Sequence, residues 1–234
     1  MAEKVHLRDG TKGWVWPLLP TDRNALVQEF ETLSPESRRR RFLGPVVHLS
    51  DAMLKHLVDE VDGVDHVALV LMAEVGEDVV PTGIARCVRY PHEPEAADIA
   101  VTVKDDWQGR GVATALLKVL MKKRPAGVTH LLTEVAADNP ASLAMLRHLG
   151  PTRTYDTGMG ILDVEVDLVN TGQTIAEEPG ERLHEVLTDP RRARLRARDL
   201  VCPWLRMTPE EAAAVDVPEP GEEPGDTEPQ ASEA

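Results

Sequence analysis

The hydrophobic pattern of the first sixty residues predicts one short strand followed by three helical segments. Residues 14–19 are mostly apolar and suit a strand, and Pro17 either keeps this strand at a sheet edge or ends it. Further helices begin at Ser34, which is followed by proline, and at Ser50, because both residues suit the N-cap position. The first of the three helical segments follows the strand, begins near Thr21 and carries apolar residues at helical spacing: Leu26, Phe30 and Leu33.

The middle of the chain carries three apolar runs rich in β-branched residues. They cover residues 67–74, 82–90 and 97–103. Short polar turns at 76–78 and 91–94 separate them. Strands joined so closely pair with their neighbours in opposite directions, so we expect an antiparallel meander.

After residue 103 the pattern alternates between helix and strand. A polar, glycine-containing loop over 105–111 precedes apolar residues at helical spacing, and Gly127 ends that helix. A strand over 129–135 follows. A helix over 141–149, which Asn139 and Pro140 open, comes next. The last expected elements are two paired strands, 152–155 and 161–166.

Composition divides the chain into a folded domain, residues 1–169, and two extensions. Residues 170–206 predict a helical extension, with five arginines between 191 and 198. Residues 207–234 are rich in Pro, Glu and Gly, contain too few apolar residues to fold, and predict a disordered acidic tail. Nine acidic residues in that tail account for most of the net charge of −14, leaving about −5 on the rest. This balance argues against nucleic-acid binding, which needs a basic footprint.

Cysteine and histidine positions predict no metal site. The two cysteines, Cys87 and Cys202, lie far apart, and His66, His92 and His148 lack ligand spacing. Cys87 falls in the middle of a strand, where a buried thiol is expected rather than a nucleophile. No apolar stretch approaches the ~20 residues of a membrane span, and the start lacks the pattern of a signal peptide. We therefore expect a cytoplasmic protein without membrane contact.

The loop before the helix at 112 has the features of an anion site. A helix N-terminus presents unpaired backbone N–H groups and the positive end of the helix dipole. Gly109 and Gly111 let an anion approach the backbone without obstruction by a Cβ atom. The loop lacks the Gly-Lys-Ser/Thr of a P-loop, and Thr114 occupies the third glycine position of a dinucleotide-binding fingerprint. Neither common nucleotide-binding motif therefore fits.

The pattern Gln-x-x-Gly-x-Ala, filled by Gln108, Gly111 and Ala113, resembles the signature of the GNAT acetyltransferase family. The strand at 97–103 and the Asn-x-x-Ser helix at 139–150 resemble further family elements. The stretches Leu18–Arg23 and Leu33–Arg38 are similar to the N-termini of bacterial protein-lysine acetyltransferases, and the whole resemblance covers roughly residues 14–167. It implies an α/β (α+β) fold: a mixed, mostly antiparallel twisted sheet flanked by helices.

The resemblance also implies acetyl-CoA as co-substrate, without a metal. Val101 and Val103 would pair with the pantetheine arm as an added strand, and Asn139 and Ser142 would contact that arm. Asn139 also suits a helix N-cap. The CoA diphosphate would be bound by the loop and the first turn of the helix: Gln108, Gly109, Arg110, Gly111, Val112, Ala113 and Thr114.

Asp98 is the residue that matches a catalytic glutamate of related enzymes, and it would help to remove the amine proton. Glu95 on the same hairpin is the alternative base, and a third interpretation makes Asp98 only a hydrogen-bond acceptor at a strand start. Many relatives place an acidic tyrosine where this chain has Leu146, and Tyr155 is the candidate substitute. The expected reaction is acetyl transfer to a primary amine on a small molecule or a protein lysine. The alternative is a non-catalytic acetyl-CoA-binding sensor.

Overall fold

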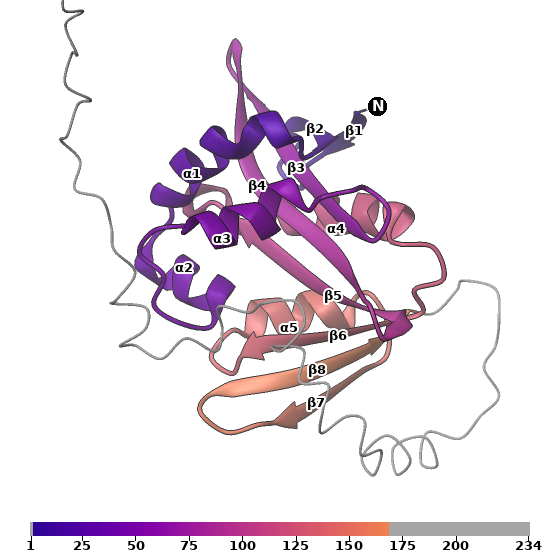
Figure 1. Ribbon diagram of the computed structural model, residues 1–234. Coiled ribbons are helices and arrows are strands. Elements are labelled where there is room, and N and C mark those ends of the chain that lie inside the picture. Colours follow the sequence, from indigo (N-terminus) through magenta and orange to yellow (C-terminus); the bar gives the residue numbers. More distant parts are fainter. Residues whose placement is uncertain (1, 169–234) are drawn as a thin grey trace, which may run out of the picture.

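A twisted sheet of eight strands organises residues 2–168, the part of the chain that the computed structural model describes (Figure 1). Its strand order is β1-β2-β3-β4-β5-β6-β8-β7. Neighbouring strands pair antiparallel except β5 and β6, which are parallel, as expected of a mixed sheet. The strands are β1 (Glu3–His6), β2 (Lys12–Pro17), β3 (His66–Val75), β4 (Asp78–Tyr90), β5 (Glu93–Val103), β6 (His130–Ala136), β7 (Thr152–Asp156) and β8 (Ile161–Asp167).

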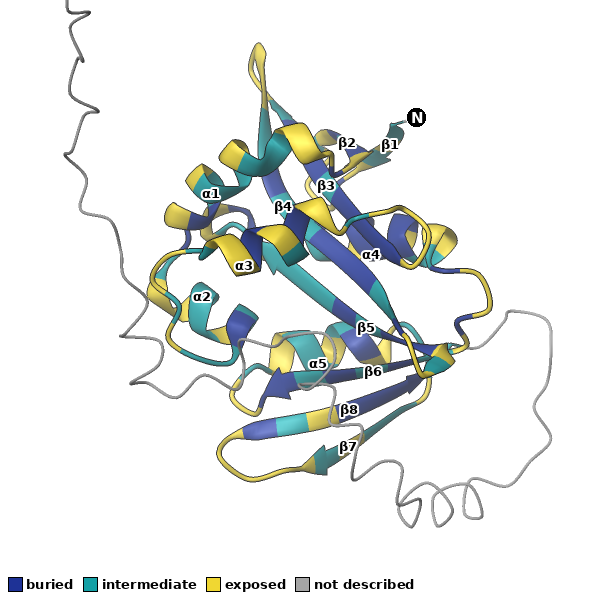
Figure 2. Cartoon of the chain, viewed as in Figure 1, coloured by how far each residue is buried: buried dark blue, intermediate teal, exposed yellow. Residues whose placement is uncertain are grey.

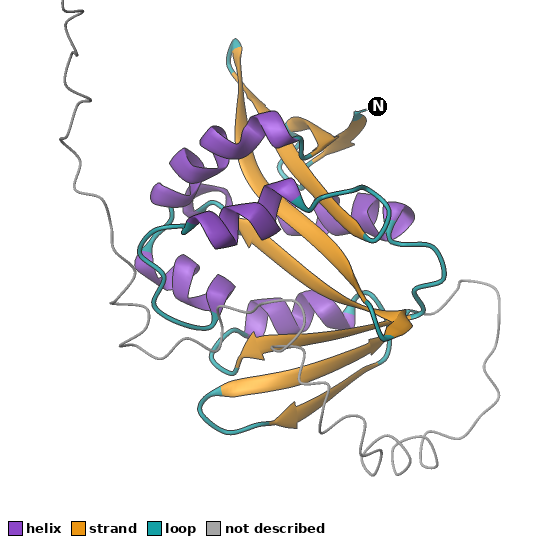
Figure 3. Ribbon diagram, viewed as in Figure 1, coloured by secondary structure: helices purple, strands orange, loops and turns teal. Residues whose placement is uncertain are grey.

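Helices cover both faces of the sheet (Figure 3). On one face lie α1 (Arg23–Glu31), α2 (Pro35–Phe42) and α3 (Asp51–Leu54), which a π-helical turn, Lys55–Asp59, extends. On the other face α4 (Val112–Lys123) packs against β3, β4 and β5. Helix α5 (Pro140–Arg147) follows β6, and short 3-10 turns at Pro20–Asp22 and Asp105–Trp107 complete the elements.

Two apolar cores hold these layers together, and Figure 2 shows that buried residues are concentrated along the central strands. The larger core joins α4 to the sheet through buried residues that include Leu116, Leu120 and Leu71. The second core lies under α1–α3, where Phe30 and Phe42 meet edge to face with ring centroids 5.7 Å apart. Burying each such side chain contributes roughly 1.5–3 kcal/mol.

The hydrophobic pattern predicted most of these elements. Ser34, Ser50 and Asn139 cap their helices as expected, each accepting a hydrogen bond from a backbone amide in the first turn. Strand β1 was missed because Glu3–His6 is too short and polar for its alternation to stand out. Pro17 ends β2, which is not a sheet edge because β1 pairs with it. The predictions for residues 170–206 and 207–234 lie outside the described residues.

Gly150 makes the closest backbone approach in the fold. A Cβ atom there would overlap the carbonyl oxygen of Asp167 at the end of β8. We therefore expect Gly150→Ala to lower the free energy of unfolding by about 3 kcal/mol, the upper range for overpacked sites. Gly44→Ala is the matched control, since its Cβ would meet only the Phe42 carbonyl oxygen at 3.9 Å. Chemical denaturation checks both, and equal stability of the two variants would contradict the expected clash.

His66 makes the stability of the second core depend on pH. Its Nε2 lies 3.3 Å from Nη1 of Arg86, which can only donate, so His66 accepts and is neutral. Burial and the charge of Arg86 lower the pKa of His66 from about 6.5 to about 3. The unfolded chain binds this proton first, so stability is complete above pH 6.5 and is lost as the pH falls towards 3.

We expect the free energy of unfolding to fall by up to about 1.4 kcal/mol per pH unit below pH 6. His66→Gln should flatten that slope because Gln can accept the Arg86 hydrogen bond without titrating. His92→Gln, at an exposed position, should leave it unchanged. Denaturation curves between pH 4 and 7 provide the measurement, and a slope that persists in His66→Gln would assign the effect elsewhere.

Candidate functional site

Strands β5 and β6 pair along only a short stretch and then diverge (Figure 1). Their parallel ladder consists of Ala96 opposite His130 and Ala97 opposite Leu131. One step further the hydroxyl of Thr133 donates to the carbonyl oxygen of Ile99 at 3.0 Å. Beyond that contact the edge of β5 is open.

Alternation along β5 determines which backbone groups face the opening. The amide of Lys104 donates to the carbonyl of Thr82 at 3.0 Å, so Lys104 belongs to a hydrogen-bonded pair with β4. In a regular antiparallel ladder every second residue does the same, so the N–H and C=O groups of Thr102 and Ala100 also point towards β4. Val101 and Val103 therefore direct their N–H and C=O groups towards the open side. An extended chain can pair with this edge as an added strand.

The loop that follows β5 presents unpaired amides beside this edge. Among residues 2–168, no carbonyl or side chain accepts a hydrogen bond from the amides of residues 109–114. Gly109 and Gly111 have φ angles of 73° and 94°, a region that glycine adopts without strain. Because these amides lie at the N-terminus of α4, the loop can bind a phosphate group.

Arg110 fastens this loop to the β1–β2 hairpin. Its Nε donates to Asp9 at 2.6 Å, and its guanidinium lies 3.8 Å from the ring centroid of Trp107. Hydrogen bonds from Thr11 and from Arg110 lower the pKa of Asp9 to about 2. The amide of Arg8 donates to the Arg110 carbonyl at 2.9 Å. The turn of this hairpin, which lies outside the predicted elements, thus holds the loop in place.

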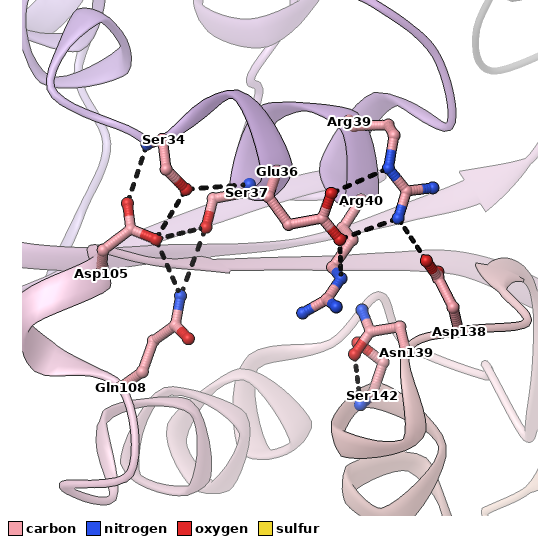
Figure 4. A network of polar contacts seen from close by, with 10 residues as sticks. All are labelled: Ser34, Glu36, Ser37, Arg39, Arg40, Asp105, Gln108, Asp138, Asn139 and Ser142. Carbon is pink, nitrogen blue, oxygen red and sulfur yellow. Dashed lines mark hydrogen bonds and ion pairs between the residues drawn. The ribbon is translucent and has the colours of Figure 1, made fainter.

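Asp105 links the loop to α2 on the opposite side (Figure 4). Its carboxylate accepts from the Ser34 amide at 2.8 Å and from the hydroxyls of Ser34 and Ser37 at 2.9 and 2.7 Å. The Gln108 carboxamide donates to Ser37 at 3.3 Å and to Asp105 at 3.4 Å. Partial burial opposes ionisation of Asp105, but the hydrogen bonds from Ser34 and Ser37 outweigh it and lower its pKa.

Helix α2 also reaches the other side of the opening. Arg39 forms an ion pair of 2.5 Å with Asp138, in the loop between β6 and α5 (Figure 4). The next residue, Asn139, accepts from the Ser142 amide at 3.2 Å, so its role as N-cap is confirmed. Helix α2 therefore bridges the two loops that flank the diverging strands.

Asp98 lies where the strands begin to diverge. It pairs across the ladder with Val88, and its side chain is partly buried. Burial raises the pKa of Asp98 above its ordinary value, although the neighbouring Thr133 hydroxyl and the charge of Arg41 offset part of the rise. Glu95 is exposed and lies three residues before Asp98, where the ladder between β4 and β5 shifts its register.

An apolar pocket of about 700 Å³ opens on the α1–α3 face of the sheet, the face to which Asp98 points. Its lining includes Arg41 and Arg86, the two cations that act on the pKa of Asp98. Exposed apolar side chains surround it at the far end: Trp16, Leu19 and Val79. Strand β5 thus offers an open backbone edge, and the apolar pocket lies on the face of the sheet to which Asp98 points.

This geometry agrees with the comparisons with known proteins. The family model described as "Acetyltransferase (GNAT) family" matches residues 31–150. The chain belongs to this family. The crystal structure of the GNAT domain of S. lividans PAT shares the fold, with a TM-score of 0.62 and 29% sequence identity, and the match covers 71% of this chain and 97% of that domain.

Two curated GNAT relatives are similar in sequence. "Acetyltransferase Pat" of Mycolicibacterium smegmatis is 31% identical over 194 residues, which is 82% of this chain and 56% of the relative. "Acetyltransferase PA5475" of Pseudomonas aeruginosa is 33% identical over 115 residues, which is 49% of this chain and 61% of the relative. The chain thus spans less than two thirds of the length of either relative.

Three further positions considered from the sequence bear on GNAT chemistry. Burial raises the pKa of the Cys87 thiol to about 12, so it remains protonated and is a poor nucleophile. Leu146 is buried in the larger core and offers no proton. Tyr155 lies on β7, which β8 separates from β6.

Within residues 2–168, no helix is long and apolar enough to cross a membrane, and no group of His, Cys, Asp or Glu side chains suits a metal.

Several residues around this GNAT site were not singled out from the sequence. Thr133 and Asp105 were missed because their partners lie 34 and 71 residues away along the chain. The contact between Arg39 and Asp138 spans 99 residues. The only local signal was the pairing of polar residues with helix and strand ends, which does not specify a distant partner.

Proposed function

We propose that this chain transfers an acetyl group from acetyl-CoA to a primary amine. The observation that carries the proposal is the open edge of β5 next to a loop whose amides are unpaired. A pantetheine arm is extended and carries amides, so it can pair with such an edge, while the diphosphate to which it is joined reaches the loop. No other part of the described chain combines these two features.

Binding would use backbone groups more than side chains. The amides from Gly109 to Thr114 would donate to the diphosphate, and Val101 and Val103 would pair with the arm. Gln108 and Arg110 would act by holding the loop, because their side chains already contact Ser37 and Asp9. Asn139 and Ser142 would border the arm from the side of α5.

The chemical step joins the amine nitrogen to the thioester carbonyl carbon and breaks the carbon–sulfur bond. Asp98, directly or through water, would accept the proton that the amine loses. The Val101 amide would donate to the carbonyl oxygen as negative charge develops there. The CoA thiol, with a pKa near ~8.5, is a tolerable leaving group without an acid at position 146.

A protein lysine is the acceptor that we favour. The similarity to the relatives named Pat supports it, as does the position of Asp98 on the face that carries the apolar pocket. Arg41 and Arg86 beside Asp98 disfavour a further positive charge, so an incoming amine would lose its proton more readily.

Release of CoA thiol from acetyl-CoA in the presence of acceptors tests the proposal. Acceptors are lysine peptides, cell-lysate proteins and small amines, with mass spectrometry of the products. We expect acceptor-dependent thiol release and acetyl-lysine in the product. The second candidate, a non-catalytic acetyl-CoA sensor, is favoured by the buried Leu146. Tight acetyl-CoA binding by calorimetry without turnover on any acceptor would support the sensor and reject the enzyme.

A further inference from the structure

The diphosphate loop carries little net positive charge of its own. Residues 105–114 contain two acids, Asp105 and Asp106, and one cation, Arg110. The guanidinium of Arg110 is engaged by Asp9 at 2.6 Å, by Thr11 at 3.2 Å and by the Trp107 ring. A doubly charged diphosphate bound here would therefore meet amides and a helix dipole but little net positive charge.

Arg8 is the cation that lies against this loop from another part of the chain. Its amide donates to the Arg110 carbonyl at 2.9 Å. A Cβ atom built on Gly111 would lie 3.1 Å from the Arg8 nitrogen and 3.3 Å from its Cβ, so the Arg8 side chain starts beside Gly111. Within residues 2–168, the exposed guanidinium of Arg8 makes no hydrogen bond or ion pair.

We propose that Arg8 is a CoA-binding residue that donates to the diphosphate at the N-terminus of α4. This inference rests on the proposed function, because it assigns one more contact to the same ligand. Arg8 lies on the β1–β2 hairpin, outside residues 31–150, the part that the family model matches. A guanidinium suits the task because its planar donors match phosphate oxygens.

The geometry also gives Arg110 and Arg8 different roles. Arg110 is fixed by Asp9 and Trp107, and this fixes in turn the hairpin from which Arg8 projects. Arg8 thus starts from an anchored backbone with a side chain free to meet the ligand. Fixing the backbone in advance lowers the entropy lost when the contact forms.

Calorimetry with acetyl-CoA and with dephospho-CoA, which keeps the diphosphate but lacks the 3′-phosphate, tests the contact. We expect Arg8→Ala to weaken both ligands about tenfold, as for loss of one charge-assisted hydrogen bond at an exposed site. Arg8→Lys should recover part of the affinity, and the difference from the unaltered chain should shrink in high salt. Lys4→Ala is the matched control, since Lys4 is an exposed cation on β1 of the same hairpin.

The outcomes separate this contact from the function as a whole. Thermal unfolding without ligand should be the same for Arg8→Ala and the unaltered chain, because the side chain has no contact to lose. Unchanged affinity for both ligands in Arg8→Ala, in a chain that binds and transfers acetyl groups, would overturn the role of Arg8 alone. A loss confined to acetyl-CoA would overturn the diphosphate assignment. An unaltered chain that binds neither ligand would overturn the proposed function as well.

Discussion

Replacement of Asp98 by Asn should lower kcat for acetyl transfer by about 10²–10³-fold, the usual contribution of a general base. The Kd for acetyl-CoA should stay within about twofold, because Asp98 points to the α1–α3 face and the proposed CoA contacts are backbone groups on the open edge. Stopped-time thiol release gives kcat, and calorimetry gives Kd. Asp98→Glu should retain activity, since it keeps a carboxylate at this position.

The pH dependence supplies a second readout. The reaction requires the carboxylate form, so kcat/KM should rise with pH through the pKa of Asp98. Because burial raises that pKa, the rise should occur above ~3.9, the ordinary value for aspartate. Asp98→Asn should remove this rise from the pH profile. If Asp98 had a purely structural role, the rise would occur at the same pH in Asp98→Asn as in the unaltered chain.

Stability distinguishes catalysis from folding at the same residue. A raised pKa in the folded state means that folding disfavours the charged form of Asp98. Its contribution to stability is therefore complete below the unfolded pKa and is lost as the pH rises through the folded pKa. At pH 7, Asp98→Asn should consequently be at least as stable as the unaltered chain in denaturation experiments.

Glu95→Gln is the matched control, and it should leave both kcat and the pH profile unchanged because Glu95 is exposed at the start of β5, before the strands diverge. A large loss of kcat in Glu95→Gln together with an active Asp98→Asn would exchange the two roles. Equal loss of kcat and of acetyl-CoA affinity in Asp98→Asn would place Asp98 in binding rather than in proton transfer.

Local chemistry explains which parts of this fold and site could be read from the sequence. Helix starts at Ser34, Ser50 and Asn139 depend on residues within one turn, and the structure has all three. The glycine-containing loop before α4 is likewise a short-range pattern. The GNAT family itself followed from the loop, one strand and one helix in the right order, and the family model confirms it.

Long-range contacts explain what the sequence did not reveal. Strand order in a sheet depends on pairings between distant segments, so β1 and its support of the loop were not anticipated. The network of Ser34 and Asp105 and the ion pair of Arg39 and Asp138 join segments that no periodicity relates. The position of Asp98 at the divergence of β5 and β6 could be inferred only from the resemblance, because a single strand carries no sign of where its partner leaves it.

Gly111→Ala should weaken acetyl-CoA binding about 100-fold, and Gly109→Ala about tenfold. Both residues have positive φ angles, which cost an alanine roughly 1–2 kcal/mol. Gly111 carries a second cost, because its Cβ would lie 3.1 Å from the Arg8 nitrogen, which is backbone and cannot easily yield. At Gly109 no atom lies within 4 Å of the added Cβ. Calorimetry with acetyl-CoA measures both variants.

The pair separates loop conformation from loop contact. Both variants strain the loop through a positive φ angle. The additional loss of acetyl-CoA affinity in Gly111→Ala, compared with Gly109→Ala, therefore reports displacement of the β1–β2 hairpin from the loop. That displacement should also break the contact between Arg110 and Asp9. Adding Asp9→Asn to Gly111→Ala should therefore cause little further loss of acetyl-CoA affinity, because both changes disrupt the same contact. Fully additive losses, or a Gly109→Ala variant as weak as Gly111→Ala, would show that the amides bind CoA without the support of the hairpin.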